Sequence, residues 1–129
     1  MKLPKPYNET KIKKKLRKEA DDLWKLACLK KYGDRCELCG RAFGITAHHF
    51  YYKGSVGHLR YEINNGVILC APCHCKLHFQ DPKLVESLII DKRGRRWYNK
   101  LKKKAEEKHY SYQTIGWYRE HIKNLQNGK

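Results

Sequence analysis

The clearest repeating pattern in the chain is helical and lies near its beginning. From about Thr10 to Tyr32, apolar residues recur at mostly three- and four-residue spacing, which predicts a long amphipathic helix ended by Gly33. Thr10 is the candidate N-cap of this helix, whereas residues 1–8, which contain two prolines, are expected to form an irregular arm.

Extended segments replace the helical pattern in the middle of the chain. The run Ile45–Tyr52 is rich in β-branched and aromatic residues and predicts a strand, and Val67–Leu69 predicts a second one. The intervening residues 53–60 contain two glycines and are expected to form a loop. Pro72 is well placed to begin a short helix that runs to about Phe79.

Three more helices are predicted after residue 80. Asp81 and Pro82 form a cap-plus-proline signal for a helix to about Lys92, which Gly94 ends. A basic helix follows over about 95–108, and Ser111 is the candidate cap of a last helix that reaches Leu125. The predicted class is therefore α+β, a small two-stranded centre between helical arms. We expect one compact unit with three parts: a basic arm and helix over 1–35, a core over 36–79 and a basic helical region over 80–129.

The charge of the chain points to a polyanionic partner. Its 29 basic and 13 acidic residues give a net charge of +16. Residues 1–35 carry 12 basic and 5 acidic groups and residues 80–129 carry 13 and 6, whereas residues 36–79 carry only 4 and 2. Two basic arms around a nearly neutral centre would grip phosphates on both sides of it, although basic helices that are merely well solvated remain the alternative. The candidate phosphate contacts are Lys13, Lys14, Lys15, Arg41, Lys53, Arg60, Arg95 and Arg96.

No stretch approaches the roughly 20 apolar residues of a membrane span, and the basic N-terminal segment lacks an apolar signal region. We therefore expect a soluble, cytoplasmic protein without membrane partners, located in the host cytoplasm if a phage encodes it. Of the six cysteines, four form two C-x-x-C pairs accompanied by histidines, which favours metal binding in a reducing compartment over disulfides.

The paired cysteines Cys36, Cys39, Cys70 and Cys73 have the spacing of a closed, structural zinc site. Cys28 and Cys75 fall outside the pairs and are expected to be free thiols.

Histidines supply a second candidate site in the same segment. His74 and His78 stand four apart on the predicted helix and hence on one face, the spacing at which two imidazoles share an ion. His48 and His49 are neighbours on a predicted strand, so their side chains should point to opposite faces. This geometry favours separate roles for the two. Alternatively, His74 replaces a cysteine in a purely structural zinc sphere.

The elements follow one another in this order: a first C-x-x-C knuckle (Cys36 to Cys39), the His-His strand, a loop, an asparagine, the second strand, a second C-x-x-C knuckle (Cys70 to Cys73) and the histidine-bearing helix. This order resembles the HNH nucleases of the ββα-metal class. The likeness covers residues 36–79, about a third of the chain, and rests on nine positions in order. They are Cys36, Cys39, His48, His49, Asn65, Cys70, Cys73, His74 and His78.

The resemblance implies a metal-dependent DNA endonuclease in which His49 is the general base that activates water. It implies that His48, His74 and His78 bind a catalytic divalent ion, Mg²⁺, Mn²⁺, Ni²⁺ or Zn²⁺, that stabilises the 3'-leaving oxygen. Asn65 would hold the loop between the strands, with Asn64 as the other candidate for the asparagine of the motif.

Residues 89–125 look like the tail of phage recombination nucleases of the NinG or Rap kind, which implies branched DNA as a second candidate substrate. Two further alternatives stay open. One is a non-catalytic zinc module that recruits DNA to a recombination or packaging complex. The other is a protein that binds or cleaves RNA.

Overall fold

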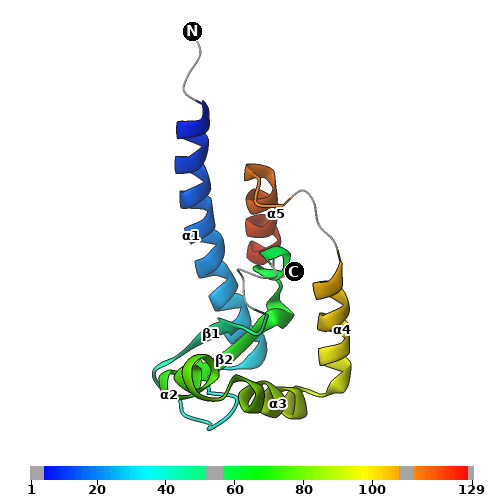
Figure 1. Cartoon of the computed structure of the whole chain (residues 1–129). Helices are drawn as coiled ribbons and strands as arrows, with labels where there is room; N and C mark the ends of the chain where they lie inside the picture. Colours follow the sequence, from blue (N-terminus) through cyan, green and yellow to red (C-terminus); the bar gives the residue numbers. More distant parts are fainter. Residues whose placement is uncertain (1–4, 52–56, 108–111, 128–129) are drawn as a thin grey trace.

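The computed structural model describes residues 5–51, 57–107 and 112–127 and has the predicted α+β class. Its longer elements are α1 (Lys5–Tyr32), β1 (Ile45–His49), β2 (Gly66–Cys70), α2 (Ala71–Cys75), α3 (Pro82–Arg93), α4 (Arg95–Glu106) and α5 (Ile115–Gln126). Short helical turns, η1 (Gly57–Leu59), η2 (Ile63–Asn65) and η3 (Lys76–Gln80), lie between them. Helices α1 and α5 run side by side above the two strands, and α3 lies below them (Figure 1).

Helix α1 is longer than its apolar pattern predicts. It begins at Lys5, so Thr10 lies inside the helix and is not its N-cap, and residues 5–8 are helical rather than irregular. Pro6 is compatible with this start, because the amide that proline lacks has no helical acceptor in the first turn. The predicted end is correct: Gly33 follows the helix with a φ of 97° and its amide donates to the Leu29 carbonyl.

The two strands form an antiparallel pair in which Ile45 is opposite Cys70 and His49 is opposite Gly66. Strand β1 ends at His49, three residues before the predicted end at Tyr52, and Tyr52 itself lies outside the described residues. Backbone pairing continues only to the Phe50 amide, which donates to the Asn65 carbonyl at 2.7 Å. The partner segment is then the helical turn η2, and the Asn65 side chain bonds the backbone of Tyr51. The partner strand therefore limits the pairing that the β-branched run favours.

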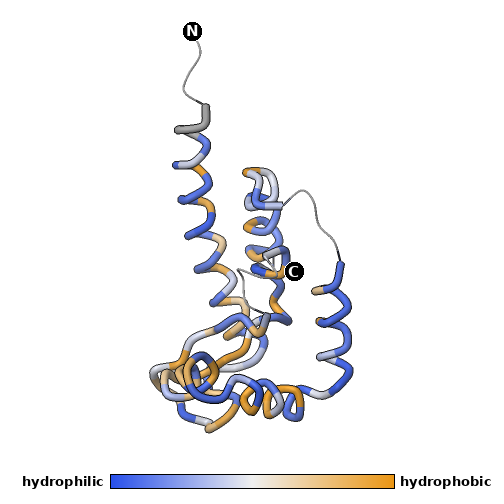
Figure 2. The backbone as a smooth tube through the Cα atoms, viewed as in Figure 1, coloured by the Kyte–Doolittle hydropathy of each residue, from blue (hydrophilic) through white to orange (hydrophobic). Residues whose placement is uncertain are grey.

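Strand β2 lies between two hydrophobic clusters and is buried along its whole length. Ile68 packs toward α1 and α5 in a first cluster with Ala20, Trp24 and Tyr118. Its neighbours in sequence belong to the second cluster, whose members are Cys36, Val67, Leu69, Cys70, Leu77, Val85 and Ile89. Because alternate residues of a strand point to opposite faces, this one strand joins the helical layer to the cysteine-rich half. Figure 2 shows hydrophobic segments gathered around the strands and α3, and a mostly hydrophilic α4.

Gly66, the first residue of β2, touches α1 closely. A β-carbon at this position would overlap the sulfur of Cys28 and lie 3.1 Å from the ring of Trp24. Only glycine lets the strand approach the helix this closely.

The helices that follow β2 differ from the prediction in detail. The expected helix from Pro72 to Phe79 is an α-helical turn, α2, continued by the π-helical turn η3. Asp81 caps α3 by accepting a hydrogen bond from the Leu84 amide, as predicted. Helix α5 begins at Ile115 with Thr114 as its cap, so the predicted cap Ser111, which lies outside the described residues, is replaced by a residue three positions later.

A buried ion pair that the sequence did not reveal holds the second core together. The Glu37 carboxylate, on the first knuckle, accepts hydrogen bonds from both Nε and Nη2 of Arg93 at 2.7 and 2.6 Å and from the Ile68 amide at 2.7 Å. The side chains of Arg93 and Glu37 are only 5% and 8% exposed, and the guanidinium also lies 3.6 Å from the centre of the Tyr32 ring. The Glu37–Arg93 ion pair thus connects α3, the first knuckle and β2.

We expect Arg93→Ala to lower the free energy of unfolding by about 3–5 kcal/mol, because it leaves the buried Glu37 charge without its partner. Denaturant titration measures this change. The matched control is Arg96→Ala, at an exposed position of α4, which should change stability by less than about 0.5 kcal/mol. Equal effects of the two substitutions would contradict the importance of the pair.

Within the described ranges, no helix combines the length and the apolar character that crossing a bilayer requires.

Candidate metal centre and histidine pocket

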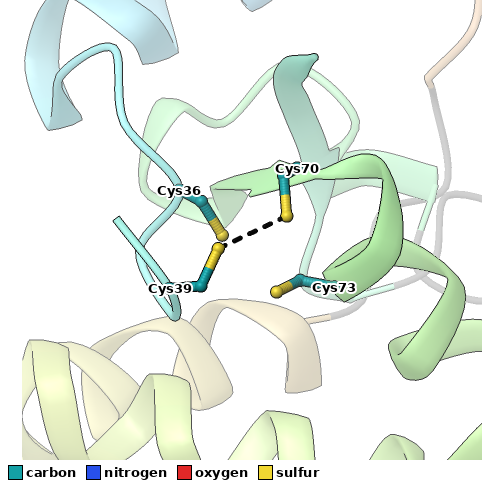
Figure 3. Close-up of side chains that lie close together, drawn as sticks. All are labelled: Cys36, Cys39, Cys70 and Cys73. Atoms are coloured by element: carbon teal, nitrogen blue, oxygen red, sulfur yellow. Dashed lines mark hydrogen bonds between the residues drawn. The ribbon is translucent and has the colours of Figure 1, made fainter. Parts of the chain in front are cut away.

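Four cysteines from two distant segments come together beside β2. The ligand sulfurs of Cys36, Cys39, Cys70 and Cys73 all lie within 4.8 Å of one another, and those of Cys39 and Cys70 are 3.5 Å apart (Figure 3). Thiolates at about 2.3 Å from a tetrahedral zinc ion stand about 3.8 Å apart, so this spacing fits zinc. The four residues could hold a zinc ion of the closed, structural type, as the sequence predicts.

The backbone around the first knuckle favours thiolate at Cys36. Burial raises the pKa of this thiol, but hydrogen bonds from the backbone at Cys39, Cys70 and Leu38 outweigh it and lower the pKa to about 6. A turn with Gly40 at a φ of 78° allows this approach. Since zinc binds the deprotonated sulfur, such a knuckle is prepared for the metal.

The other two cysteines stay outside this cluster, as predicted. Cys28 is fully buried in the first core, and burial raises the pKa of its thiol to about 12. Cys75 is exposed on α2.

A pocket of about 240 Å³ lies where α1, β1 and the α2–η3 segment meet. All four candidate histidines line it: His48 and His49 from β1, His74 from α2 and His78 from η3. Its lining residues are Asp21, Trp24, Lys25, Thr46, Ala47, His48, His49, His74 and His78. The long N-terminal helix, which lies outside the segment that resembles HNH nucleases, therefore forms one wall of the pocket.

The rings of His48, His74 and His78 form one group in this pocket. His48 stacks on His74 with ring centres 3.6 Å apart, and His78 lies 4.4 Å from His74 with its ring perpendicular. Burial, together with the neighbouring rings of His74 and His78, lowers the pKa of His48 to about 3. Burial and His78 also lower the pKa of His74. The neutral imidazoles that result are the form that binds metal ions.

The nitrogens of these three rings do not converge. In the part of the chain that the structure describes, the four cysteines are the only group of three or more potential ligands whose donor atoms lie within 4.8 Å of one another. The planes of His48 and His74 are only 13° apart, and lone pairs in two parallel planes cannot point to one ion. At least one ring must turn for the two histidines to bind the same metal.

His49 occupies a different environment, although it follows His48 directly. Its ring stacks on Trp24 with centres 4.1 Å apart and planes 5° apart, and its Nε2 lies 2.9 Å from the Arg60 carbonyl oxygen. Because a carbonyl only accepts, Nε2 carries the hydrogen, and the neutral ring then has its acceptor lone pair on Nδ1. The two neighbouring histidines contact different partners, although both line the same pocket.

Arg60 is held by a residue that the sequence pattern did not single out. Asp21 on α1 accepts two hydrogen bonds from its guanidinium, at 2.9 and 2.8 Å, and the Arg60 side chain is 13% exposed. Arg60 also supplies the backbone carbonyl that contacts Nε2 of His49. A phosphate contact by the Arg60 guanidinium, as the sequence suggests, would compete with this ion pair and stays a prediction. The sequence pattern gave no signal for this contact, because nothing in it links Asp21 to a residue 39 positions later.

The two asparagines of η2 differ clearly. Asn65 is fully buried, and its side chain accepts from the Tyr51 amide at 2.8 Å and donates to the carbonyls of Tyr51 and Leu59. Asn64 instead accepts from the side chains of Lys31 and Tyr32. The contacts across the loop between the strands, which the resemblance implies for one of the two, are therefore made by Asn65.

The predicted phosphate contacts are spread over several surfaces. Lys14 and Lys15 are exposed on α1, whereas Lys13 pairs with Glu9 at 3.1 Å. Arg41 is exposed after the first knuckle, and Arg95 and Arg96 are exposed at the start of α4. Lys53 lies outside the described residues.

Comparison with known proteins adds no relative: no protein-family model, curated protein or solved structure matches the chain.

Proposed function

We propose that the protein is a metal-dependent endonuclease that hydrolyses phosphodiester bonds in DNA, with an HNH-type centre stapled by zinc. The observation that supports this most strongly is the division of the pocket. His49 contacts Trp24 and the Arg60 carbonyl, while His48, His74 and His78 contact one another. A purely structural site would not require four histidines of two kinds around one open pocket.

In the proposed reaction, a water molecule beside His49 attacks phosphorus and transfers its proton to Nδ1 of the ring. The P–O3' bond breaks, and the leaving oxygen takes a proton from solvent, so the products are a 5'-phosphate and a 3'-hydroxyl. Trp24 and the Arg60 carbonyl keep the imidazole in one orientation and tautomer through this step. Asp21 acts one step further away, by holding Arg60.

His48, His74 and His78 are the residues that would hold the catalytic ion. When bound, a divalent ion supplies the positive charge that stabilises the phosphate and the 3'-oxygen. Imidazole ligands suit Mn²⁺, Ni²⁺ or Zn²⁺ better than Mg²⁺. The stacked rings of His48 and His74 leave this site incomplete until one of them turns.

Incubation of the purified protein with supercoiled plasmid and with a four-way junction, across Mg²⁺, Mn²⁺, Ni²⁺ and Zn²⁺, tests the proposal. We expect nicked or linear plasmid with at least one ion, and loss of cleavage when a chelator removes that ion. Cleavage of the junction alone would favour the recombination nuclease that residues 89–125 suggest.

Absence of cleavage with every ion would favour the second candidate, a zinc-dependent DNA-binding module without catalysis. One specific observation favours that candidate: the ring nitrogens of the three histidines do not point to a common position in the described structure. It predicts a single tightly bound metal per chain, which elemental analysis measures.

A further inference from the structure

One face of α1 carries a row of lysines that begins at the histidine pocket. Lys25 lines the pocket, and Lys18, Lys14 and Lys11 follow at intervals of seven, four and three residues toward the N-terminus. At 3.6 residues per turn these four positions lie within an arc of about 60°. Lys15 adds to the same face within an arc of about 100°. We call Lys11, Lys14, Lys15, Lys18 and Lys25 the α1 lysine row.

The α1 lysine row is turned away from the core. All five of its members are exposed, whereas Ala20, Trp24 and Cys28, on another side of the helix, are buried against the strands and α5. The N-terminal part of α1 also extends beyond the end of α5 (Figure 1). No packing requirement explains why this face should be basic.

Acidic residues reduce the charge of the row only in part. Lys18 pairs with Asp22 at 3.1 Å, with side chains that are 81% and 61% exposed, and Glu19 lies at the edge of the row. An ion pair this exposed contributes little and is readily exchanged for another partner. Five lysines against the carboxylates of Asp22 and Glu19 leave a clear excess of positive charge next to the pocket, because Asp21, which also lies there, is already paired with Arg60.

The length of the row fits a double helix. From Lys25 to Lys11 the helix rises about 21 Å, a length that spans about six phosphates of one DNA strand. We propose that this row binds the backbone of duplex DNA on one side of the phosphate that occupies the histidine pocket, so that the duplex runs along α1 toward its N-terminus. This inference rests on the proposed function for the position of the cleaved phosphate, but binding along α1 can be measured without cleavage.

The salt dependence of binding tests the α1 lysine row. A labelled duplex of about 20 base pairs is titrated with protein at several KCl concentrations, in chelator so that no cleavage occurs. Removal of one phosphate-binding lysine should reduce the slope of log K against log salt by about 0.9. The triple variant Lys11→Gln/Lys14→Gln/Lys18→Gln should therefore show a slope smaller by about 2–3 and an affinity at least about tenfold weaker near 0.1 M salt.

A matched control lies on α4, which Figure 1 shows on the far side of α5 from α1. Lys100, Lys102 and Lys103 are exposed there, and their triple glutamine variant has the same net charge as the α1 variant. We expect its slope to change by less than about 1. Equal reductions in both variants would attribute the effect to overall charge and overturn the proposal, as would an unchanged slope in the α1 variant.

A single-stranded DNA of the same length distinguishes the kind of partner. A straight row on a rigid helix matches a rigid duplex, so the α1 substitutions should weaken binding of duplex more than binding of single strand. A larger effect on single strand would overturn the assignment to duplex DNA. The slope measurement also separates the two proposals, because wild-type protein that binds along α1 but cuts nothing would refute the nuclease and leave the α1 surface supported.

Discussion

Replacement of His49 by alanine is expected to lower the rate of DNA cleavage by about 10²- to 10⁴-fold, because the proposed water loses the group that accepts its proton. Zinc content and affinity for duplex DNA should stay close to those of the wild type, since the four cysteines and the α1 lysine row do not include His49. Plasmid nicking under single-turnover conditions measures the change.

His49→Gln separates proton transfer from structural support. The amide nitrogen of glutamine can still donate to the Arg60 carbonyl, yet the side chain has no basic lone pair at neutral pH. This variant should fold like the wild type and remain inactive. His58→Ala is the matched control, because His58 contacts the Lys104 carbonyl at 2.8 Å and does not line the pocket. Cleavage by His49→Gln at the wild-type rate would show that the base is a different group.

Cys70→Ser is expected to cause the largest loss of stability. The sulfur of Cys70 belongs to the four-cysteine cluster, and the residue is also part of the second hydrophobic core. Zinc binding to small domains contributes a free energy of about 10–16 kcal/mol, comparable with the whole stability of an ordinary domain. Without it, the knuckle, β2 and α3 should no longer pack, and a chelator should have the same effect on the wild type.

Thermal unfolding monitored by circular dichroism, together with elemental analysis of zinc, measures the effect of Cys70→Ser. The control is Cys75→Ser, which alters an exposed thiol five residues away that lies outside the cluster. Its zinc content and melting temperature should match the wild type. If Cys70→Ser binds stoichiometric zinc and keeps the wild-type melting temperature, zinc bound by the four cysteines does not stabilise the cysteine-rich half of the protein.

Local patterns in the sequence predicted much of the fold. The three- and four-residue spacing of apolar positions correctly located α1, and the cap-plus-proline signal at Asp81 located α3. Strand β1 is shorter than its β-branched run because the segment that would continue its partner strand is the helical turn η2. Helix α1 is longer than predicted, since a proline in the first turn, here Pro6, is compatible with a helix.

In the candidate site, too, one part could be predicted from the sequence and another depends on tertiary contacts. The four cysteines could be grouped from spacing alone, because a C-x-x-C knuckle places two sulfurs at one metal whatever surrounds it. The histidine pocket depends on contacts between distant segments. Trp24 and Asp21 on α1 orient His49 and Arg60, and neither stands out in the sequence, since helical periodicity shows which face is buried and not what it touches.

By itself, the sequence determined the α+β class, the cysteine cluster and the strong positive charge, since each depends on residue type and short-range spacing. Only the tertiary structure decided that Asn65 rather than Asn64 bridges the loop, that Glu37 and Arg93 join the first knuckle to α3, and that the lysines of α1 form a row leading from the histidine pocket. The physical reason is that hydrogen bonds and pockets depend on three-dimensional distance, which folding sets between residues that are far apart along the chain.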